Sequence, residues 1–175
     1  EVITTPFTYF ATAEAIVLVG AKPVFVDINP HTFNINYKNI EKHINKRTKA
    51  IMPVHIFGQS AEIGEIKKIC RKHNLKLIED CAQSFGAKKN NKYTGTFGDF
   101  GCFSFFPTKN LGCAGDGGMI ATNSLAKMKI LKKLRNHGGL IRNVHEYIGY
   151  NSRLDEIQAS ILLTKIKIIN SLDKK

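Results

Sequence analysis

The sequence has no long hydrophobic run: no stretch of its 175 residues approaches the roughly 20 apolar residues that a membrane span needs. It also shows no basic segment followed by an apolar stretch at its N terminus, so we expect no signal peptide. Hydrophobic residues make up 43% and charged residues 23% of the chain, which excludes disorder as the main state. One globular domain is the default at this length.

Cysteine is scarce, and its spacing does not fit a metal site. Cys70, Cys81, Cys102 and Cys113 are separated by 11, 21 and 11 residues, and no Cys-X-X-Cys pair occurs. Cys81 and Cys102 lie in apolar, strand-like segments. We therefore expect reduced, buried thiols in a cytoplasmic protein, and no metal.

Acidic residues are outnumbered by basic ones. The chain has 14 Asp and Glu against 26 Lys and Arg, which gives a formal net charge of +12 and a pI near 9.6. Of the basic residues, 21 are Lys and only 5 are Arg. Nucleic-acid binders favour clustered Arg and stacking aromatics, so we interpret the charge as a solvated, Lys-rich surface that can steer an anionic small substrate. A basic, non-enzymatic binding or regulatory module is the alternative, supported by the charge alone.

Strand-like and helix-like segments alternate along the chain. The expected strands are Glu1–Thr5, Pro23–Ile28, Ala50–Phe57, Leu75–Asp80, Gly101–Phe106 and Met119–Thr122. The expected helices are Phe10–Val19, Asn39–Ile44, Ala61–His73, Ser124–Arg135 and Arg153–Leu172, and Lys88–Thr94 is expected to be a loop. Near-continuous apolar strands alternating with helices predict an α/β protein with a parallel sheet covered on both faces. In such sheets ligands bind at the carboxyl ends of the strands.

Two strand ends carry residues that could do chemistry. Asp80 follows the apolar strand Leu75–Asp80, where a helix N-cap or a structural hydrogen bond is the alternative role. Lys109 follows an aromatic strand, where an exposed loop lysine is the alternative. A lysine beside apolar surface loses some of its preference for the ammonium form and can become a Schiff-base nucleophile. An acid and a lysine converging at one sheet edge is the pattern that pyridoxal 5'-phosphate (PLP) requires.

Ordered segments over almost the whole chain resemble the DegT/StrS-type PLP-dependent nucleotide-sugar aminotransferases. The matching segments are Thr5–Glu14, Gly20–Asp27, Thr48–His55, Glu79–Gln83, Phe103–Gly112, Gly115–Gly118 and Gly149–Gln158. The resemblance implies a three-layer αβα fold of the aspartate-aminotransferase-like large domain. It also implies that the strand Met119–Thr122 runs antiparallel to the rest of a mostly parallel sheet.

The resemblance assigns roles around the cofactor. Lys109 would hold the PLP aldehyde as an imine and move the proton during transamination. Asp80 would pair with the pyridinium nitrogen, and Gln83 would hydrogen-bond the ring hydroxyl. The implied reaction moves an amino group, by expectation from glutamate, to a keto group of a nucleotide-linked sugar in polysaccharide biosynthesis. A PLP-dependent sugar dehydratase on the same scaffold is the alternative, although such relatives typically lack the lysine that is present here.

The remaining implied roles concern the ring faces and the phosphate. Phe10 would stack on one face of the ring and Ala82 would cover the other, whereas Phe7 is better explained by core packing. Ser104 would donate to the phosphate. Asn151 would reach the phosphate of a neighbouring subunit, so the resemblance implies a homodimer with a shared site.

The chain begins with Glu1 rather than Met and ends on a charged helical pattern. We therefore expect an excerpt of a longer protein. By resemblance, residues 1–175 form the central part of the PLP-binding large domain, with 153–172 a long helix leading toward a C-terminal small domain. The phosphate loop that relatives carry earlier in their sequences also lies outside this chain, so we expect the chain alone to be inactive.

Overall fold

The computed structural model describes residues 1–169 and divides them between two compact units. The first unit comprises Glu1–Ser104 and Met119–Ala121. The second unit comprises Phe105–Gly118 and the chain from Thr122 onward.

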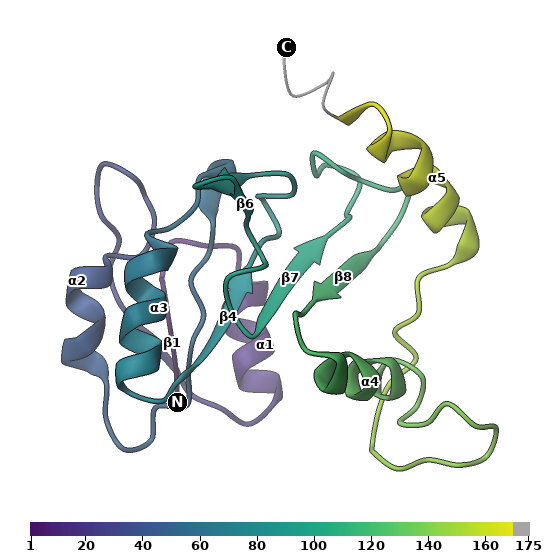
Figure 1. Ribbon diagram of the computed structural model, residues 1–175, viewed down its shortest axis with the longest axis horizontal. Helices are drawn as coiled ribbons and strands as arrows, with labels where there is room; N and C mark the ends of the chain where they lie inside the picture. Colours follow the sequence, from purple (N-terminus) through teal and green to yellow (C-terminus); the bar gives the residue numbers. More distant parts are fainter. Residues whose placement is uncertain (170–175) are drawn as a thin grey trace. The chain divides into compact units, whose positions relative to one another are not determined.

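A mostly parallel sheet organises the first unit (Figure 1). Among the described residues its strands are β1 (Val2–Thr4), β2 (Pro23–Phe25), β3 (Ala50–Ile51), β4 (Lys76–Asp80), β7 (Phe100–Ser104) and β8 (Gly118–Ala121), in the order β2-β1-β3-β4-β7-β8. The pairs β1–β2, β1–β3, β3–β4 and β4–β7 are parallel. Figure 1 shows β8 running against β7, as the resemblance implied. The predicted α/β architecture is confirmed.

Helices of the first unit cover this sheet. They are α1 (Ala11–Leu18), α2 (Tyr37–Ile40) and α3 (Ile63–Lys72), with short 3-10 turns at Glu41–His43 and Ile56–Gly58. The predicted helix Ala61–His73 is confirmed as α3, and its Ile63, Ile66 and Cys70 are buried in one cluster with Ile3 of β1 and Leu77 of β4. Burial of these side chains stabilises the unit, by about 25 cal/mol per Å² of apolar surface removed from water.

The second unit holds α4 (Leu125–Leu134) and α5 (Glu156–Ile166). Ser124 caps α4, since its Oγ accepts a hydrogen bond from the Lys127 N–H at 3.3 Å. The helix predicted over Arg153–Leu172 begins later, at Glu156, and residues 170–172 of that prediction lie outside the described residues. Within α5, Ile157 is exposed and Leu162 is the buried position.

Two further predictions were wrong in extent. The strand expected over Ala50–Phe57 stops at Ile51 and gives way to a single bridge at Val54 and a 3-10 turn. Proline at position 53 has no N–H to donate to a ladder, which limits strand pairing there. The helix expected over Asn39–Ile44 begins earlier, at Tyr37, because the Asn36 side chain accepts the Lys38 N–H and caps it.

The segment Lys88–Thr94, predicted to be a loop, is a small antiparallel hairpin. Its strands are β5 (Lys88–Lys89) and β6 (Lys92–Tyr93), joined by Asn90 and Asn91. Both asparagines have positive φ, at 51° and 60°. A two-residue hairpin turn of type I′ requires left-handed backbone at both central positions, and asparagine tolerates it better than most residues.

All four cysteines are free thiols, as predicted, and Cys70, Cys81 and Cys113 are buried while Cys102 is half-buried. None of the helices within residues 1–169 combines the length and the apolar character that a membrane crossing needs.

Candidate active site

The carboxyl ends of the central strands converge on Asp80. The strands β2 and β3 lie on either side of β1, so the strand order reverses between β1 and β3, where ligands of open α/β sheets bind. Asp80 ends the neighbouring strand β4. Its backbone is fixed by the chain that follows β3: its N–H donates to the Pro53 carbonyl at 2.9 Å, and its carbonyl accepts the His55 N–H at 3.0 Å.

The Asp80 carboxylate is oriented by two donors. Its Oδ1 accepts the Ala82 N–H at 3.1 Å, and its Oδ2 accepts the hydroxyl of Thr12 at 2.8 Å. The side chain is half-buried, and each oxygen keeps lone-pair capacity for a further donor. A carboxylate held in one orientation with unused acceptor sites is suited to receive a cationic N–H from a ligand.

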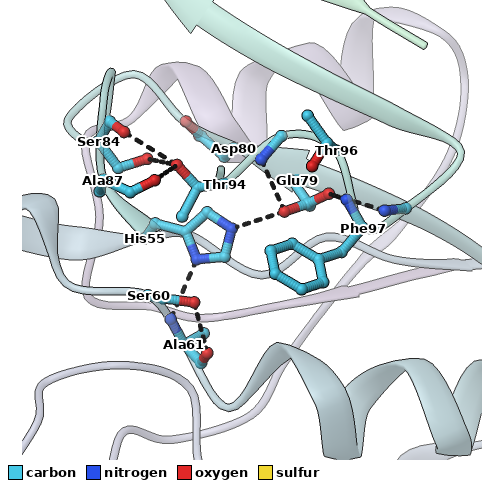
Figure 2. Close-up of polar contacts among 12 residues, drawn as sticks. His55, Ser60, Ala61, Glu79, Asp80, Ser84, Ala87, Thr94, Thr96 and Phe97 are labelled. Atoms are coloured by element: carbon cyan, nitrogen blue, oxygen red, sulfur yellow. Dashed lines mark hydrogen bonds and ion pairs between the residues drawn. The ribbon is translucent and has the colours of Figure 1, made fainter. Parts of the chain in front are cut away.

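The preceding residue, Glu79, has a different environment on the opposite face of β4. Its side chain is fully buried and accepts four hydrogen bonds (Figure 2). Oε2 receives the His55 Nε2–H at 3.0 Å and the Gly95 N–H at 2.8 Å. Oε1 receives the N–H groups of Phe97 and Gly98, both at 2.7 Å. Burial opposes the ionised form, but the hydrogen bonds from His55, Gly98 and Gly95 outweigh it and hold the pKa of the Glu79 carboxyl below its ordinary value.

His55 has a single tautomer in this network. Its Nδ1 accepts the Ala61 N–H at 3.0 Å and therefore carries no proton, so Nε2 carries the proton that it donates to Glu79 (Figure 2). His55, Glu79 and Cys81 bring their potential ligand atoms within 4.8 Å of one another. Because both imidazole nitrogens and both carboxylate oxygens already have partners, we interpret this group as a hydrogen-bond network and not as a metal site.

The Glu79 network holds the loop that carries Ala82 and Gln83. The far end of this loop, at Gly95–Gly98, is bound by the Glu79 carboxylate. Within the loop, the Thr94 hydroxyl donates to the Ser84 carbonyl at 2.9 Å (Figure 2). The approach is close, since a Cβ on Gly101 would lie 2.3 Å from the Gly95 backbone. The loop is therefore pinned at both ends, and the two residues after Asp80 are held in place.

The other predicted site residues of the first unit are accessible at the same strand ends. Gln83 is exposed, and Ala82 and Ser104 are half-buried. Ser104 ends β7, the parallel neighbour of β4. Phe10, at the start of α1, is 72% exposed, and the adjacent Tyr9 is 79% exposed, so both aromatic rings are available for stacking. Phe7, expected in the core, is instead 41% exposed and packs against Phe33 and Phe57.

Lys109 and Asn151 belong to the second unit. The Lys109 N–H donates to the Phe106 carbonyl at 2.9 Å, so the lysine sits on a turn. The residue is half-buried, and its amine has no hydrogen-bond or ion-pair partner within residues 1–169. The turn is braced within its unit, because the Cys113 thiol contacts the Phe105 carbonyl at 3.0 Å. Asn151 is exposed, and its Oδ1 accepts the Arg153 Nε–H at 2.9 Å. That these two residues complete the Asp80 site stays a prediction.

Thr12, His55 and Glu79 support the site without having been singled out from the sequence. Thr12 precedes Ile16 by four residues on the buried side of α1, where an apolar residue would be the default. Glu79 is an acid within an apolar strand, and His55 closes another apolar segment. A polar residue at a position that the periodicity assigns to the core is the signal that could have revealed each of them.

Comparison with known proteins establishes the family. Residues 1–175 match the DegT/DnrJ/EryC1/StrS aminotransferase family, and the chain belongs to it. It is 52% identical over 162 residues to UDP-N-acetyl-3-dehydro-alpha-D-glucosamine 3-aminotransferase of Acidithiobacillus ferrooxidans, which covers 93% of this chain and 44% of that protein. It is 53% identical over 165 residues to a Geobacillus stearothermophilus protein named pleiotropic regulatory protein, with 94% and 44% covered.

Comparison with solved structures leads to the same family. A family aminotransferase from Brucella abortus superposes with a TM-score of 0.93 at 43% identity, covering 97% of this chain and 48% of that one. NtdA from Bacillus subtilis, solved with bound cofactor PMP, superposes with a TM-score of 0.86 at 36% identity, covering 97% and 39%. The chain thus has the fold of the sugar aminotransferases, and it spans about half the length of the relatives it matches.

Proposed function

We propose that this chain is the cofactor-binding half of a PLP-dependent aminotransferase that transfers an amino group to a keto group of a nucleotide-linked sugar. The observation that carries the proposal is the Asp80 carboxylate. It ends a central strand, it is fixed by the Ala82 N–H and the Thr12 hydroxyl, and it keeps acceptor capacity toward a ligand. Family membership and the name of the relative from Acidithiobacillus ferrooxidans support the reaction class.

The residues of the first unit fit the chemistry of PLP. Asp80 would accept the N–H of the pyridine ring, and Gln83, whose side chain is exposed, would bind the ring hydroxyl. Ala82 leaves room for a flat ring beside Asp80, and Phe10 or Tyr9 offers an aromatic face. Ser104 would donate to the phosphate, and Asn151 would serve the phosphate of a neighbouring subunit in a homodimer. When bound, PLP supplies an electron sink, which depends on a protonated ring nitrogen.

Lys109 is the proposed catalytic residue. Its uncommitted amine would hold the cofactor covalently between turnovers, and its Nζ would then take the proton from the substrate carbon and return it on the other side of the transfer. Such a role needs an amine that is not tied up in an ion pair, which agrees with the absence of one within the described residues. The +12 net charge favours approach of an anionic nucleotide diphosphate sugar.

The test uses the full-length protein that contains this chain. Wild-type protein incubated with PLP should show the absorption of lysine-bound cofactor, and glutamate should convert it to the pyridoxamine form. Lys109→Ala should remove the lysine-bound absorption and the formation of 2-oxoglutarate with a keto-sugar. Lys132→Ala, at an exposed lysine on α4, is the matched control and should keep both. Transamination that survives in the Lys109→Ala protein would overturn the proposal.

The same assay separates the alternatives. Consumption of the sugar by dehydration, without 2-oxoglutarate, would favour a dehydratase on this scaffold. A folded wild-type protein that binds neither PLP nor sugar would favour a regulatory module, for which the name of the Geobacillus stearothermophilus relative is the supporting observation.

A further inference from the structure

A chain of two hydroxyl groups leads to the Asp80 carboxylate. The Thr12 Oγ1 lies 2.8 Å from Asp80 Oδ2, and the Thr8 Oγ1 lies 2.8 Å from Thr12 Oγ1. A carboxylate oxygen can only accept, so the single hydroxyl proton of Thr12 points to Asp80. The Thr12 oxygen is then free to accept, and the proton between the two threonines comes from Thr8. Hydrogen bonds in such a chain polarise one another, which strengthens the last one.

The position of Thr12 makes this contact specific. Thr12 is 5% exposed and, with Ile16, forms the buried side of α1, a helix that is otherwise rich in apolar residues. Valine has nearly the same shape and would satisfy the packing. Among residues 1–169, the hydroxyl has two partners, Thr8 and Asp80, and Asp80 lies 68 residues away in sequence. A buried hydroxyl at such a place needs a reason, and the orientation of Asp80 provides one.

We propose that Thr12 is a positioning residue for Asp80. Its hydroxyl fixes Oδ2 while the Ala82 N–H fixes Oδ1, so the plane of the carboxylate is set before the cofactor ring arrives. Thr8 in turn orients the Thr12 hydroxyl. This inference rests on the proposed function, because it assigns the fixed carboxylate to the ring nitrogen of PLP.

The threonine at position 48 offers a matched control for the substitution. Thr12→Val removes the hydroxyl and keeps the shape, whereas Thr12→Ser keeps the hydroxyl and removes the methyl group. Thr48 has the same exposed fraction of 5%, and its hydroxyl accepts the Asn45 N–H at 3.0 Å in a different part of the first unit. Thr48→Val therefore reproduces the loss of a buried hydroxyl without touching Asp80.

The experiment compares these variants in the full-length protein. We expect Thr12→Val to weaken PLP binding about tenfold, as is typical for the loss of a hydrogen bond to a charged group. In protein loaded with ¹⁵N-labelled PLP, the ring-nitrogen signal of this variant should move toward the unprotonated position. We expect Thr12→Ser and Thr48→Val to retain the wild-type affinity and the wild-type nitrogen signal. The kcat of Thr12→Val should fall while KM for the sugar stays unchanged, since Thr12 is buried and offers almost no surface to a substrate.

A measurement without cofactor keeps the two proposals apart. In apo protein labelled with ¹³C at the aspartate carboxyl groups, the signal that Asp80→Asn abolishes should shift in Thr12→Val and stay in place in Thr48→Val. Wild-type protein that fails to bind PLP would overturn the proposed function, whatever this signal does. Wild-type protein that binds PLP, together with a Thr12→Val variant that matches it in affinity and nitrogen signal, would overturn the positioning role alone.

Discussion

Glu79 and Asp80 are consecutive carboxylates on one strand, and their surroundings differ in every respect. Glu79 points to the buried face of β4, where four N–H groups occupy its oxygens. Asp80 points to the opposite face, where one backbone N–H and one hydroxyl hold it and part of its acceptor capacity is unused. Successive side chains of a strand point to opposite faces, so one backbone supports both arrangements.

The difference separates structural from chemical use of an acid. A buried charge is tolerated when hydrogen bonds replace its hydration, and Glu79 has this compensation from groups of the protein itself. Such a carboxylate has little capacity left for a ligand. Asp80 receives fewer hydrogen bonds and stays half-buried, so a ligand can donate to the acceptor sites that its carboxylate has left. We infer that Glu79 holds the loop in place, whereas Asp80 is the acid that suits the proposed cofactor site.

Replacing each acid with its amide should give the largest difference in stability between the two positions. In Glu79→Gln, the amide NH₂ must face two donors whichever way it turns, because His55 cannot offer an acceptor without losing the Ala61 N–H. We expect a loss of about 3 kcal/mol in the free energy of unfolding. Asp80→Asn should cost at most about 1 kcal/mol, because the Thr12 hydroxyl can turn to accept from an amide.

Activity should show the reverse order. Asp80→Asn should lower the proposed transamination about 100-fold in protein that remains folded, because it removes the charge that would stabilise the cofactor ring. Melting curves of the apo proteins measure the predicted stability losses. Formation of 2-oxoglutarate, at a temperature where both variants are folded, measures the predicted losses of activity. A Glu79→Gln protein as stable as wild type would contradict the structural role of Glu79.

Substitutions of the β7 residues that pair with the two acids test the same difference, and we expect a smaller effect on stability. Gly101 pairs with Glu79, and Cys102 pairs with Asp80. A methyl group on Gly101 would lie 2.3 Å from the backbone of Gly95, so Gly101→Ala should displace the loop that Glu79 binds and cost about 2 kcal/mol. Cys102→Ala removes one half-buried sulfur atom and should cost less than 1 kcal/mol. Thermal melting of the two variants measures both values, and equal losses would contradict the close approach of the Gly95 loop.

The sequence predicted Asp80 better than it predicted Glu79, for a physical reason. Asp80 ends an apolar strand, and strand ends are where parallel sheets bind ligands, so its position alone indicates a site. The partners of Glu79 come from backbone N–H groups 16 to 19 residues further on and from His55 on another segment. Backbone donors leave no mark in the amino-acid pattern. The contribution of Thr12 has the same origin, since its partner is 68 residues away.

Element type was predictable from periodicity, whereas element ends were decided by single residues. The parallel strands and α3 follow from apolar runs and from the spacing of Ile63, Ile66 and Cys70. Pro53 shortened a strand by removing a donor. The hairpin at Lys88–Tyr93 was missed because its flanking residues are mostly lysines, although the pair Asn90-Asn91 was a usable turn signal.

Acid should reduce the difference in the free energy of unfolding between the wild-type protein and Glu79→Gln. The folded-state pKa of Glu79 lies below its ordinary value of 4.5, because the hydrogen bonds outweigh burial. The stabilisation is therefore fully present above pH 4.5 and is lost as the pH falls through the lower, folded-state pKa. We expect the stability gap between the two proteins to be constant near neutral pH and to narrow below pH 4.5. Urea unfolding at a series of pH values measures this gap, in which the titration of the other carboxyl groups cancels, and a gap that widens in acid would contradict the network.

The thiols beside the two acids test the same difference through their rates of alkylation, where we expect the smallest effect. Cys81 lies on the Glu79 face and is buried, whereas Cys102 lies across from Asp80 and is half-buried. Burial raises the pKa of the Cys102 thiol to about 11 and that of Cys81 further, so both are poor nucleophiles at neutral pH. We expect iodoacetamide to modify Cys102 slowly and Cys81 only after unfolding, as followed by mass spectrometry of the apo protein. Faster modification of Cys81 than of Cys102 in folded protein would mean that the Glu79 face opens before the Asp80 face, against the order of burial on which both assignments depend.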